Sequence, residues 1–398
     1  MRILMLSWEY PPLVVGGLGR HVEALARELA AQGHDVRVVT RGDAPSRSRE
    51  QRDGVTVLRA ALDPLAIDFT TETLLGWSQA SEHALVRTAL PALGHWRPDV
   101  VHAHDWLVAQ TAATVVEQTG AALVATLHAS EAGRHQGWLP RPLNLAIHSV
   151  ERWLAQRADA VITCSTTMQH EVSQLFELPA HHVCVIPNGI DATRWTTTAR
   201  AKRAARDRFA TESPLLVFAG RLVHEKGVQT LLRAIRPLRE AHAGLRLVVA
   251  GAGVHEDALR AQARRLRIAR SVEWLGFVPE ADLPALLGAA DAVVVPSLYE
   301  PFGIVALEAA VAATPLVVAE TGGLRDLAAA SVAAASFPAG DAEALASAVG
   351  KVLIDPAAAR RTAARAARSV RRDFTWSAVA RQTVDVYRRA AVTAPGGP

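Results

Sequence analysis

The sequence has few cysteines, no long apolar run and little excess charge of either sign. Its two cysteines, Cys164 and Cys184, are too few for a disulfide framework or a cysteine-rich zinc site, and they indicate a reducing compartment. No apolar run approaches the roughly 20 residues that span a bilayer. Residues 1–2 lead straight into an apolar segment, without the cationic region and small-residue cleavage site of a secretory signal. These absences predict a cytoplasmic protein.

Charge and composition exclude two further classes of protein. Basic residues number 43 and acidic residues 39, and this excess of four charges gives little reason to expect nucleic-acid binding. Apolar residues make up 50% of the chain and charged residues 21%, which is the balance of a folded protein rather than a disordered one. A chain of 398 residues is longer than a single hydrophobic core usually supports. It suits two domains of similar size, since domains average about 150 residues.

Short apolar runs alternate with longer segments of helical period along almost the whole chain. The runs that predict strands are residues 3–6, 36–39, 55–58, 100–103, 123–127, 160–163, 183–186, 215–219, 245–250, 272–275, 292–295 and 316–319. Helices are expected between them, for example at residues 21–31, 74–93, 107–117 and 168–175. Strands that are apolar on both faces and separated by helices predict parallel sheets covered on both sides. Two such series in tandem predict an α/β fold with two doubly wound domains.

The expected domain boundary is the turn-rich segment at residues 187–191, which ends the first series of strands. We therefore expect an N-terminal domain at residues 1–190 and a C-terminal domain at residues 191–375. Residues 376–391 have a helical period and follow the last strand of the second series. We assign residues 376–398 to a separate C-terminal segment that contains this helix.

The first strand-to-helix turn is rich in glycine. Residues 7–12 (Ser-Trp-Glu-Tyr-Pro-Pro) follow the first strand, and residues 16–19 (Gly-Gly-Leu-Gly) open the next helix. Backbone N–H groups of Gly16 and Gly17 can approach an anion closely there, and the helix N-terminus adds partial positive charge. The turn lacks the Gly-x-Gly-x-x-Gly dinucleotide fingerprint. It predicts a phosphate contact, and the alternative is a loop that only reverses the chain.

A polar cluster, His102-Ala103-His104-Asp105-Trp106, lies at the end of the strand at residues 100–103. The two histidines project to one side of that strand, but the sequence shows no third well-spaced ligand, so we expect no metal. Instead, the cluster predicts a polar site at which Trp106 can stack on a sugar. His128 follows another strand directly, at the same carboxyl edge, and is either part of this site or a structural histidine.

Two loops of the second series carry charges suited to a nucleoside diphosphate. Arg221 and Lys226 lie in the loop after residues 215–219, where a planar guanidinium and a point charge can bind phosphate oxygens. The alternative is a solvated surface pair. Glu300 and Glu308 lie after residues 292–295, before and inside the next helix, and can accept hydrogen bonds from sugar and ribose hydroxyls.

Taken in order, the glycine loop, His128, the Gly-Arg-x(4)-Lys-Gly loop and the two glutamates resemble the retaining GT-B glycosyltransferases of family 4. The resemblance covers essentially the whole chain. Residues 7–12, 16–19 and 104–106 look most like the bacterial glycogen synthase and α-glucan glucosyltransferase branch. The resemblance implies two Rossmann-like domains facing a central cleft, with the C-terminal helix crossing back to the N-terminal domain.

The resemblance also implies roles for individual residues. Arg221 and Lys226 neutralise the leaving diphosphate, Glu300 holds donor-sugar hydroxyls, and His128 borders the anomeric carbon. The implied donor-binding residues are Gly16, Gly17, Val278, Phe302, Gly303, Ile304 and Glu308, with the nucleobase along residues 276–278. The implied acceptor-binding residues are Glu9, Asp105, Trp106 and Trp138. No metal or other cofactor is expected, because the two cations take that role.

The implied reaction moves glucose from a nucleotide sugar to an α-1,4-glucan with retained configuration. Since no residue offers an enzyme nucleophile, we favour front-side departure, in which the leaving diphosphate helps to deprotonate the incoming hydroxyl. The related starch synthases carry Lys-x-Gly-Gly in the first loop, whereas this chain has Val-Val-Gly-Gly at residues 14–17. This difference leaves UDP-glucose and ADP-glucose both open as donors.

Three alternatives share the fold. A lipid-directed hexosyltransferase, such as a phosphatidylinositol mannosyltransferase using GDP-mannose, needs peripheral membrane contact, which we do not favour. Arg361, Arg365, Arg368 and Arg372 can share one helical face for anionic lipid, but the sequence shows no apolar insertion face beside them. A nucleotide-sugar 2-epimerase acts without an acceptor. A sugar-binding protein without activity is disfavoured, because the charged residues of both donor loops are present.

Overall fold

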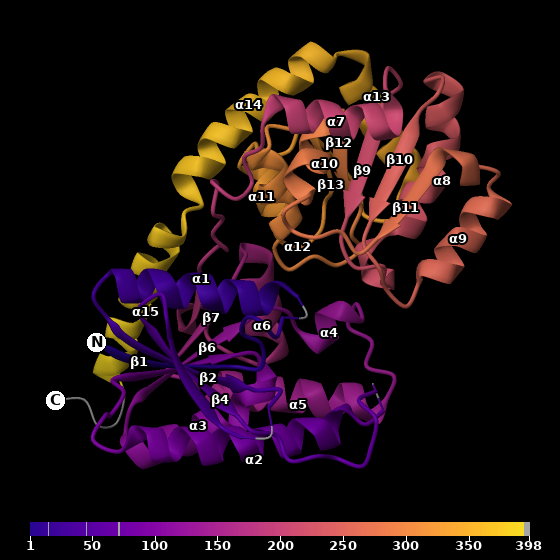
Figure 1. Ribbon diagram of the computed structural model, residues 1–398. Coiled ribbons are helices and arrows are strands. Elements are labelled where there is room, and N and C mark those ends of the chain that lie inside the picture. Colours follow the sequence, from indigo (N-terminus) through magenta and orange to yellow (C-terminus); the bar gives the residue numbers. More distant parts are fainter. Residues whose placement is uncertain (15, 45, 71, 394–398) are drawn as a thin grey trace. The chain divides into compact units, whose positions relative to one another are not determined.

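The computed structural model describes residues 1–14, 16–44, 46–70 and 72–393, which form two compact units (Figure 1). Unit 1 contains Met1–Gly189 together with the helix that begins at Trp376, and unit 2 contains Ile190–Thr375. Val15 of the first glycine loop and residues 394–398 of the expected C-terminal segment lie outside the described residues.

Unit 1, where described, is built on an eight-stranded sheet with the order β3-β4-β2-β1-β5-β6-β7-β8. Neighbouring strands are parallel except for the β3–β4 pair, which is antiparallel. The parallel arrangement brings the carboxyl ends of the other seven strands to one edge. The strands are β1 (Arg2–Ser7), β2 (Asp35–Arg41), β3 (Ser48–Arg52), β4 (Val55–Ala60), β5 (Val100–His104), β6 (Ala122–Leu127), β7 (Ala160–Thr163) and β8 (Val183–Val185).

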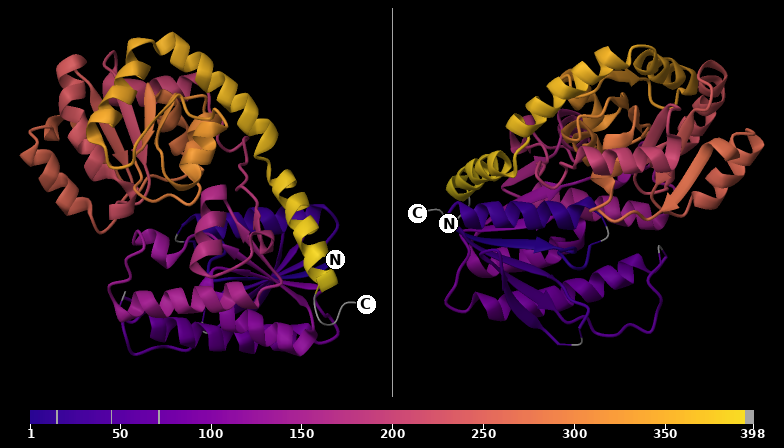
Figure 2. Two further views of the ribbon diagram at one scale, coloured as in Figure 1. Left: turned by 180° about the vertical axis from the view of Figure 1, so that it is seen from behind. Right: turned by 45° about the horizontal axis from the view of Figure 1, so that its top comes forward.

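Helices cover both faces of this sheet, with α1 and α15 on one face and α2, α3 and α5 on the other (Figures 1 and 2). Their bounds are α1 (Gly17–Ala31), α2 (Leu74–Leu93), η1 (Trp106–Val108), α3 (Ala109–Thr119), α4 (Glu131–Arg134), α5 (Pro142–Arg157), α6 (Thr166–Leu175), η2 (Ala180–His182) and α15 (Trp376–Thr393). Helix α15 joins unit 1 because its apolar face, including Val379, Val384 and Tyr387, is buried in the core of that unit. At Gly189 a Cβ would lie 2.7 Å from the Trp376 ring, so glycine permits this close approach.

Unit 2 is built on a six-stranded parallel sheet, within the described part of the chain, with the order β11-β10-β9-β12-β13-β14. The strands are β9 (Leu215–Ala219), β10 (Arg246–Ala250), β11 (Val272–Gly276), β12 (Ala292–Val295), β13 (Leu316–Ala319) and β14 (Ala335–Phe337). The helices are α7 (Ala199–Ala210), η3 (His224–Lys226), α8 (Val228–Ala241), α9 (Glu256–Arg265), η4 (Ala269–Ser271), α10 (Leu283–Ala289), α11 (Ile304–Val311), α12 (Gly322–Ala329), α13 (Ala342–Ile354) and α14 (Pro356–Asp373).

The structure confirms the expected α/β class and both series of parallel strands. Sequence analysis missed two strands at sheet edges. Strand β3 reads Ser-Arg-Glu-Gln-Arg and is mostly exposed, so it has no apolar pattern to detect. Strand β14 is three residues long, too short for a periodic signal.

Candidate active site

In unit 2 the loops that follow β9 and β12 are held together by backbone contacts. The amides of Leu298 and Tyr299 both donate to the carbonyl oxygen of Glu225, at 2.8 and 3.3 Å. Gly227 has a φ of +71°, and a Cβ there would lie 1.8 Å from the carbonyl oxygen of Pro296. Glycine adopts this positive φ without strain, and because it has no Cβ the Pro296 carbonyl can lie this close. The two loops therefore form one surface at the carboxyl ends of β9 and β12.

This surface brings Lys226 into direct contact with Glu300. Lys226 Nζ lies 2.7 Å from Glu300 Oε2, and the Ser297 hydroxyl donates to the same oxygen over 3.1 Å. The side chains of Lys226 and Glu300 are 22% and 12% exposed, so both charges are partly removed from water but remain reachable. An ammonium and a carboxylate lie side by side, the first suited to phosphate oxygens and the second to hydroxyl donors.

Arg221 lies at the start of the β9–α8 loop. Its side chain is 61% exposed, and its guanidinium lies 3.8 Å from the Glu225 carboxylate. The loose contact leaves the guanidinium able to turn toward a ligand, but an exposed ion pair of this kind is also common at protein surfaces. The role of Arg221 toward a diphosphate stays a prediction.

The second donor loop leads into α11 through Gly303, whose φ is +99°. A Cβ on Gly303 would lie 2.5 Å from Leu324 Cδ2, so the close packing of α12 requires glycine here. Phe302 and Glu308 are 4% and 3% exposed, while Ile304 is half-buried at the first position of α11. The amides at the start of this helix are available to an anion in principle, and the donor roles of these residues stay predictions.

The expected nucleobase segment, residues 276–278, follows β11. The amide of Gly251 donates to the carbonyl oxygen of Gly276 over 2.7 Å and ties the β10 and β11 loops together. Phe277 is 82% exposed, whereas Val278 is half-buried. The structure thus presents an aromatic ring beside Val278, and the contact of this segment with a base stays a prediction.

In unit 1 four histidines gather near the carboxyl ends of the strands. His102 uses both ring nitrogens, with Nδ1 2.6 Å from the Tyr387 hydroxyl and Nε2 2.7 Å from the Thr126 hydroxyl. His104 Nδ1 lies 3.1 Å from His128 Nε2, while His104 Nε2 is buried without a partner among the described residues. His102 is therefore a structural residue that joins β5 to α15, whereas His104 and His128 form a pair.

His21, on α1, completes a cluster with His104 and His128. Its Nδ1 lies 2.8 Å from the side-chain oxygen of Asn188, and its ring centroid lies 4.6 Å from that of His128. One nitrogen of each of the three rings lies within 4.8 Å of the others. A tetrahedral zinc ion, with bonds of about 2.05 Å, requires nitrogens about 3.3 Å apart, so the rings would have to move closer to hold it. The expectation that no metal takes part stays a prediction.

Asp105 fixes the start of the His128 loop. Its backbone has a φ of +61°, a sparsely populated conformation for this residue type, and its carboxylate accepts the His128 amide over 2.7 Å. Burial raises the pKa of Asp105 to about 6. Burial also lowers the pKa of His128 to about 4. At neutral pH, His128 is therefore an uncharged imidazole, suited to hydrogen bonds with hydroxyl groups rather than to holding charge.

The glycine loop of unit 1 already holds an anionic group. The amide of Gly16 donates to Glu9 Oε2 over 3.0 Å, and α1 begins at Gly17. A carboxylate at the start of a helix is a favourable arrangement, because amide donors point outward there. A phosphate at Gly16 must therefore displace Glu9 from this amide, so the donor role of Gly16 and Gly17 stays a prediction.

The two tryptophans expected on the acceptor side differ in exposure. Trp106 opens η1 and is 7% exposed, so its ring packs beneath the surface and offers little area for stacking. Trp138 is 71% exposed in the segment between α4 and α5. The acceptor roles of both residues stay predictions, and Trp138 has the exposed ring that such a role requires.

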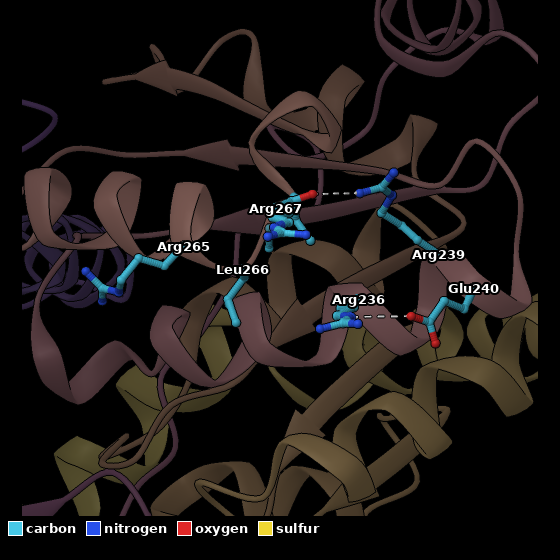
Figure 3. A pocket seen from close by; sticks show the side chains of 7 residues that line it. Arg236, Arg239, Glu240, Arg265, Leu266 and Arg267 are labelled. Carbon is cyan, nitrogen blue, oxygen red and sulfur yellow. Dashed lines mark hydrogen bonds and ion pairs between the residues drawn. The ribbon is translucent and has the colours of Figure 1, made fainter.

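A hollow of about 300 Å³ lies in unit 2 where α8 and α9 end. Figure 3 shows Arg236 paired with Glu240, and Arg239 donating to the carbonyl oxygen of Arg267. Cations at helix C-termini complement the helix dipole, which accounts for these arginines structurally. The hollow is lined by Arg236, Arg239, Glu240, Arg265, Leu266, Arg267 and Ile268, none of which is a predicted site residue.

Comparisons with known proteins identify the family of the chain. Residues 15–194 match the family model described as Glycosyltransferase Family 4, and residues 200–370 match the model described as Glycosyl transferases group 1. A glycogen synthase of Mycobacterium tuberculosis is 46% identical over 401 residues, covering 98% of this chain and 95% of the relative. The chain belongs to glycosyltransferase family 4.

Other members of the family have different substrates in their names. A D-inositol 3-phosphate glycosyltransferase of Kineococcus radiotolerans is 34% identical over 424 residues, covering 98% of this chain and 95% of the relative. Among solved structures, sucrose-phosphate synthase of Thermosynechococcus elongatus has a TM-score of 0.82 at 24% identity, with 98% of each chain covered. The catalytic domain of Arabidopsis thaliana starch synthase IV has a TM-score of 0.75 at 20% identity, covering 98% and 99%. These two structural similarities show that the chain shares its fold with these enzymes.

The comparisons confirm the expected family, the GT-B type of fold and the activity class of a hexosyltransferase. Among the described residues, no helix is both long enough and apolar enough to cross a bilayer.

Sequence analysis missed two residues of the candidate site, His21 and Asn188. His21 lies four residues after Gly17, so it shares a face of α1 with the glycine loop, and this spacing was a usable signal. Asn188 lies in the turn-rich segment that indicated only a domain boundary. Its contact with His21 joins residues 167 positions apart, which no local pattern reveals.

The buried titratable groups predict that the free energy of unfolding falls as the pH is lowered from about 6.5 to about 5. Below pH 6.5 the unfolded chain protonates histidines that burial keeps neutral in the folded protein, so each such histidine costs about 1.4 kcal/mol per pH unit. Buried carboxyls with raised pKa values act in the opposite direction. In the described chain burial lowers the pKa of four such histidines, namely His21, His102, His104 and His128, and raises the pKa of three carboxyls, namely Glu82, Asp105 and Glu151. The pKa values of the partly exposed His34 and His148 are also lowered, and these two residues contribute less because solvent screens them.

Urea unfolding followed by tryptophan fluorescence at about pH 7, 6 and 5 measures this dependence. We expect the midpoint to move to lower urea with each step toward acid. A midpoint that stays constant or rises would show that the buried carboxyls outweigh the histidines.

Proposed function

We propose that this family 4 glycosyltransferase transfers glucose from a nucleoside-diphosphate glucose to the non-reducing end of an α-1,4-glucan, with retained configuration. The observation that carries the proposal is the 46% identity with a glycogen synthase over 98% of the chain. Both UDP-glucose and ADP-glucose are included as donors. One structural neighbour is an Anabaena protein in complex with UDP-glucose, and another is a starch synthase bound to ADP and acarbose.

The donor residues proposed in unit 2 act mainly through charge. Lys226 and Arg221 stabilise the negative charge that grows on the leaving diphosphate, an electrostatic effect that contributes several kcal/mol in such sites. Glu300, 2.7 Å from Lys226, accepts hydrogen bonds from hydroxyls of the donor sugar. Glu308 binds the ribose hydroxyls, and the backbone at Gly303 binds phosphate.

The proposed step forms one bond and breaks one bond at the anomeric carbon. The acceptor hydroxyl oxygen bonds to this carbon from the same face from which the diphosphate oxygen departs. The hydroxyl proton passes to the departing phosphate, so the products are the extended glucan and a nucleoside diphosphate. Neutral His128, in unit 1, is assigned to the reacting sugar, and Asp105 and Glu9 to the acceptor side.

Transfer to a lipid is the principal alternative. Four arginines on α14 are exposed, as a lipid surface requires, namely Arg361, Arg365, Arg368 and Arg372. The largest aliphatic side chain of this helix, Val370, is fully buried in unit 2. An exposed basic face without apolar side chains to enter the bilayer binds anionic lipid only weakly, so glucan remains the favoured acceptor.

A panel of donors and acceptors tests the proposal. The purified protein is incubated with radiolabelled UDP-glucose, ADP-glucose or GDP-mannose, and with glycogen, α-D-glucose 1-phosphate, anionic lipid vesicles or no acceptor. We expect label in glycogen from one or both glucose donors. Label only in the sugar phosphate or the lipid would replace the glucan as acceptor, and conversion of the donor without an acceptor would indicate an epimerase. A cytoplasmic location and independence from metal stay predictions.

A further inference from the structure

Three aromatic side chains lie together near the carboxyl edge of the unit 1 sheet, and no role has been assigned to them above. Trp8 follows β1, Phe69 lies in the segment between β4 and α2, and Trp77 lies in the first turn of α2. The rings of Trp8 and Phe69 are stacked, with centroids 6.5 Å apart and planes inclined by 18°. Phe69 and Trp77 meet edge to face at 5.6 Å. We call these three residues the aromatic shelf.

Hydrogen bonds fix the segment that carries Phe69. The carbonyl oxygen of Asp68 accepts the Thr73 hydroxyl over 2.6 Å and the Trp77 indole N–H over 3.2 Å. The amide of Thr70 donates to the Thr73 hydroxyl over 2.9 Å. Backbone on both sides of Phe69 is therefore tied to the start of α2, so the segment that carries the ring is positioned before any ligand binds.

One ring of the shelf is exposed to solvent. Phe69 is 58% exposed, while Trp8 beneath it is only 6% exposed. The Arg41 guanidinium, at the end of β2, lies 4.8 Å from the Trp8 ring centroid. Arg41 is the last residue of β2, and Trp8 and Phe69 come after its two neighbours, β1 and β4. The shelf therefore lies toward the edge at which open parallel sheets bind their ligands.

The chemistry of the shelf favours a neutral sugar over an anion. A glucose ring has an apolar face of C–H groups, which packs on an aromatic ring, and a rim of hydroxyls, which needs polar partners. The exposed charges in the segment of Phe69, Asp68 and Glu72, are acidic, whereas the Arg41 guanidinium lies against the largely buried Trp8 ring. Carboxylates accept hydrogen bonds from hydroxyls but repel phosphate.

We propose that the aromatic shelf binds a glucose unit of the glucan acceptor, beyond the two units at its reacting end. This inference rests on the proposed function and adds to it a reason to prefer long acceptors over short ones. A chain too short to reach Phe69 gains nothing from the shelf. A longer chain gains one stacking contact, which typically corresponds to about five- to tenfold in affinity.

The test compares Phe69→Ala with wild type on glycogen and on maltose as acceptors. We expect KM for glycogen to rise about five- to tenfold, with kcat on maltose and KM for the donor unchanged. Phe69→Trp, which keeps an aromatic face, should retain the wild-type KM. The matched control is Trp153→Ala, which removes a 40% exposed aromatic side chain from the later part of α5, remote from the carboxyl edge.

Calorimetric binding of maltoheptaose without donor gives an independent measurement. We expect Phe69→Ala to weaken this binding by the same factor, and Trp153→Ala to leave it unchanged. If wild type transfers glucose to glycogen but Phe69→Ala matches it in KM and in maltoheptaose affinity, the shelf proposal is wrong and the proposed function stands. If wild type neither transfers glucose to glucan nor binds maltoheptaose, the proposed function fails, and the shelf proposal fails with it.

Discussion

Replacing Lys226 by alanine is expected to lower kcat about 100-fold or more while donor affinity weakens by a smaller factor. Negative charge on the diphosphate grows as the bond to the sugar breaks, so a fixed ammonium stabilises the transition state more than the bound donor. Lys226 is held for this purpose, because its Nζ is 2.7 Å from Glu300 and its loop is tied to the β12 loop.

The chain offers a matched control for this substitution. The sequence contains only three lysines, Lys202, Lys226 and Lys351. Lys351 is exposed on α13, so Lys351→Ala removes the same charge away from the site and should retain wild-type kcat. Lys226→Arg keeps the charge but changes its shape, and we expect it to restore part of the lost kcat.

Steady-state kinetics and donor binding by calorimetry separate the two effects of Lys226→Ala. The substitution removes the ammonium from the Glu300 carboxylate, which keeps the hydrogen bond from the Ser297 hydroxyl, so circular dichroism must show an intact fold. A folded Lys226→Ala protein with wild-type kcat would remove Lys226 from the leaving-group role. Equal losses in donor affinity and in kcat/KM would mean that Lys226 binds the ground state and the transition state alike.

Replacing Gly227 by alanine is expected to abolish activity and to destabilise the protein by about 3 kcal/mol. Part of this cost comes from the φ of +71°, which is strained for alanine by about 1 kcal/mol. The larger part comes from the new Cβ, which would lie 1.8 Å from the Pro296 carbonyl oxygen. Both groups belong to backbone, so the β9 and β12 loops must move apart, and this separates Lys226 from Glu300.

Gly120 is a control that separates the strain of the positive φ from the steric clash of the new Cβ. It has φ and ψ of 69° and 13°, against 71° and 13° for Gly227, but a Cβ on Gly120 meets no atom within 4 Å. Gly120→Ala should therefore cost about 1 kcal/mol and retain full activity. Urea unfolding and kcat of the two variants give the comparison. If Gly227→Ala were as stable and as active as Gly120→Ala, the loops would tolerate a methyl group at Gly227. The close approach of Gly227 to the Pro296 carbonyl would then not be needed to hold the two loops together.

The regular elements of the fold could be predicted because their signals are local. Strands such as β1 and β9 are apolar at nearly every position, since both faces of a parallel sheet are covered. The exposed edge strand β3 escaped detection for the opposite reason, because it buries little and so needs no apolar side chains. For these three strands, burial rather than intrinsic propensity decided whether the sequence revealed them.

The candidate site could be predicted only in part. Loops at the carboxyl ends of strands were recognisable, and Lys226 and Glu300 were chosen from them by their charge. Their contact across 74 residues depends on how far each loop extends after its strand, which the sequence does not specify. The same limit hid the stacking of Phe69 on Trp8, because Phe69 comes from a segment without regular structure.

By itself, the sequence determined the α/β class, the tandem series of parallel strands and the family, because each of these depends on periodicity or on short motifs. Which polar groups meet depends on how the elements pack. The tertiary structure placed His21 against Asn188, it directed the Gly16 amide to Glu9 rather than to open solvent, and it covered Trp106. The physical reason is that hydrogen bonds and stacking act over a few ångströms, a distance set by packing between elements that lie far apart along the chain.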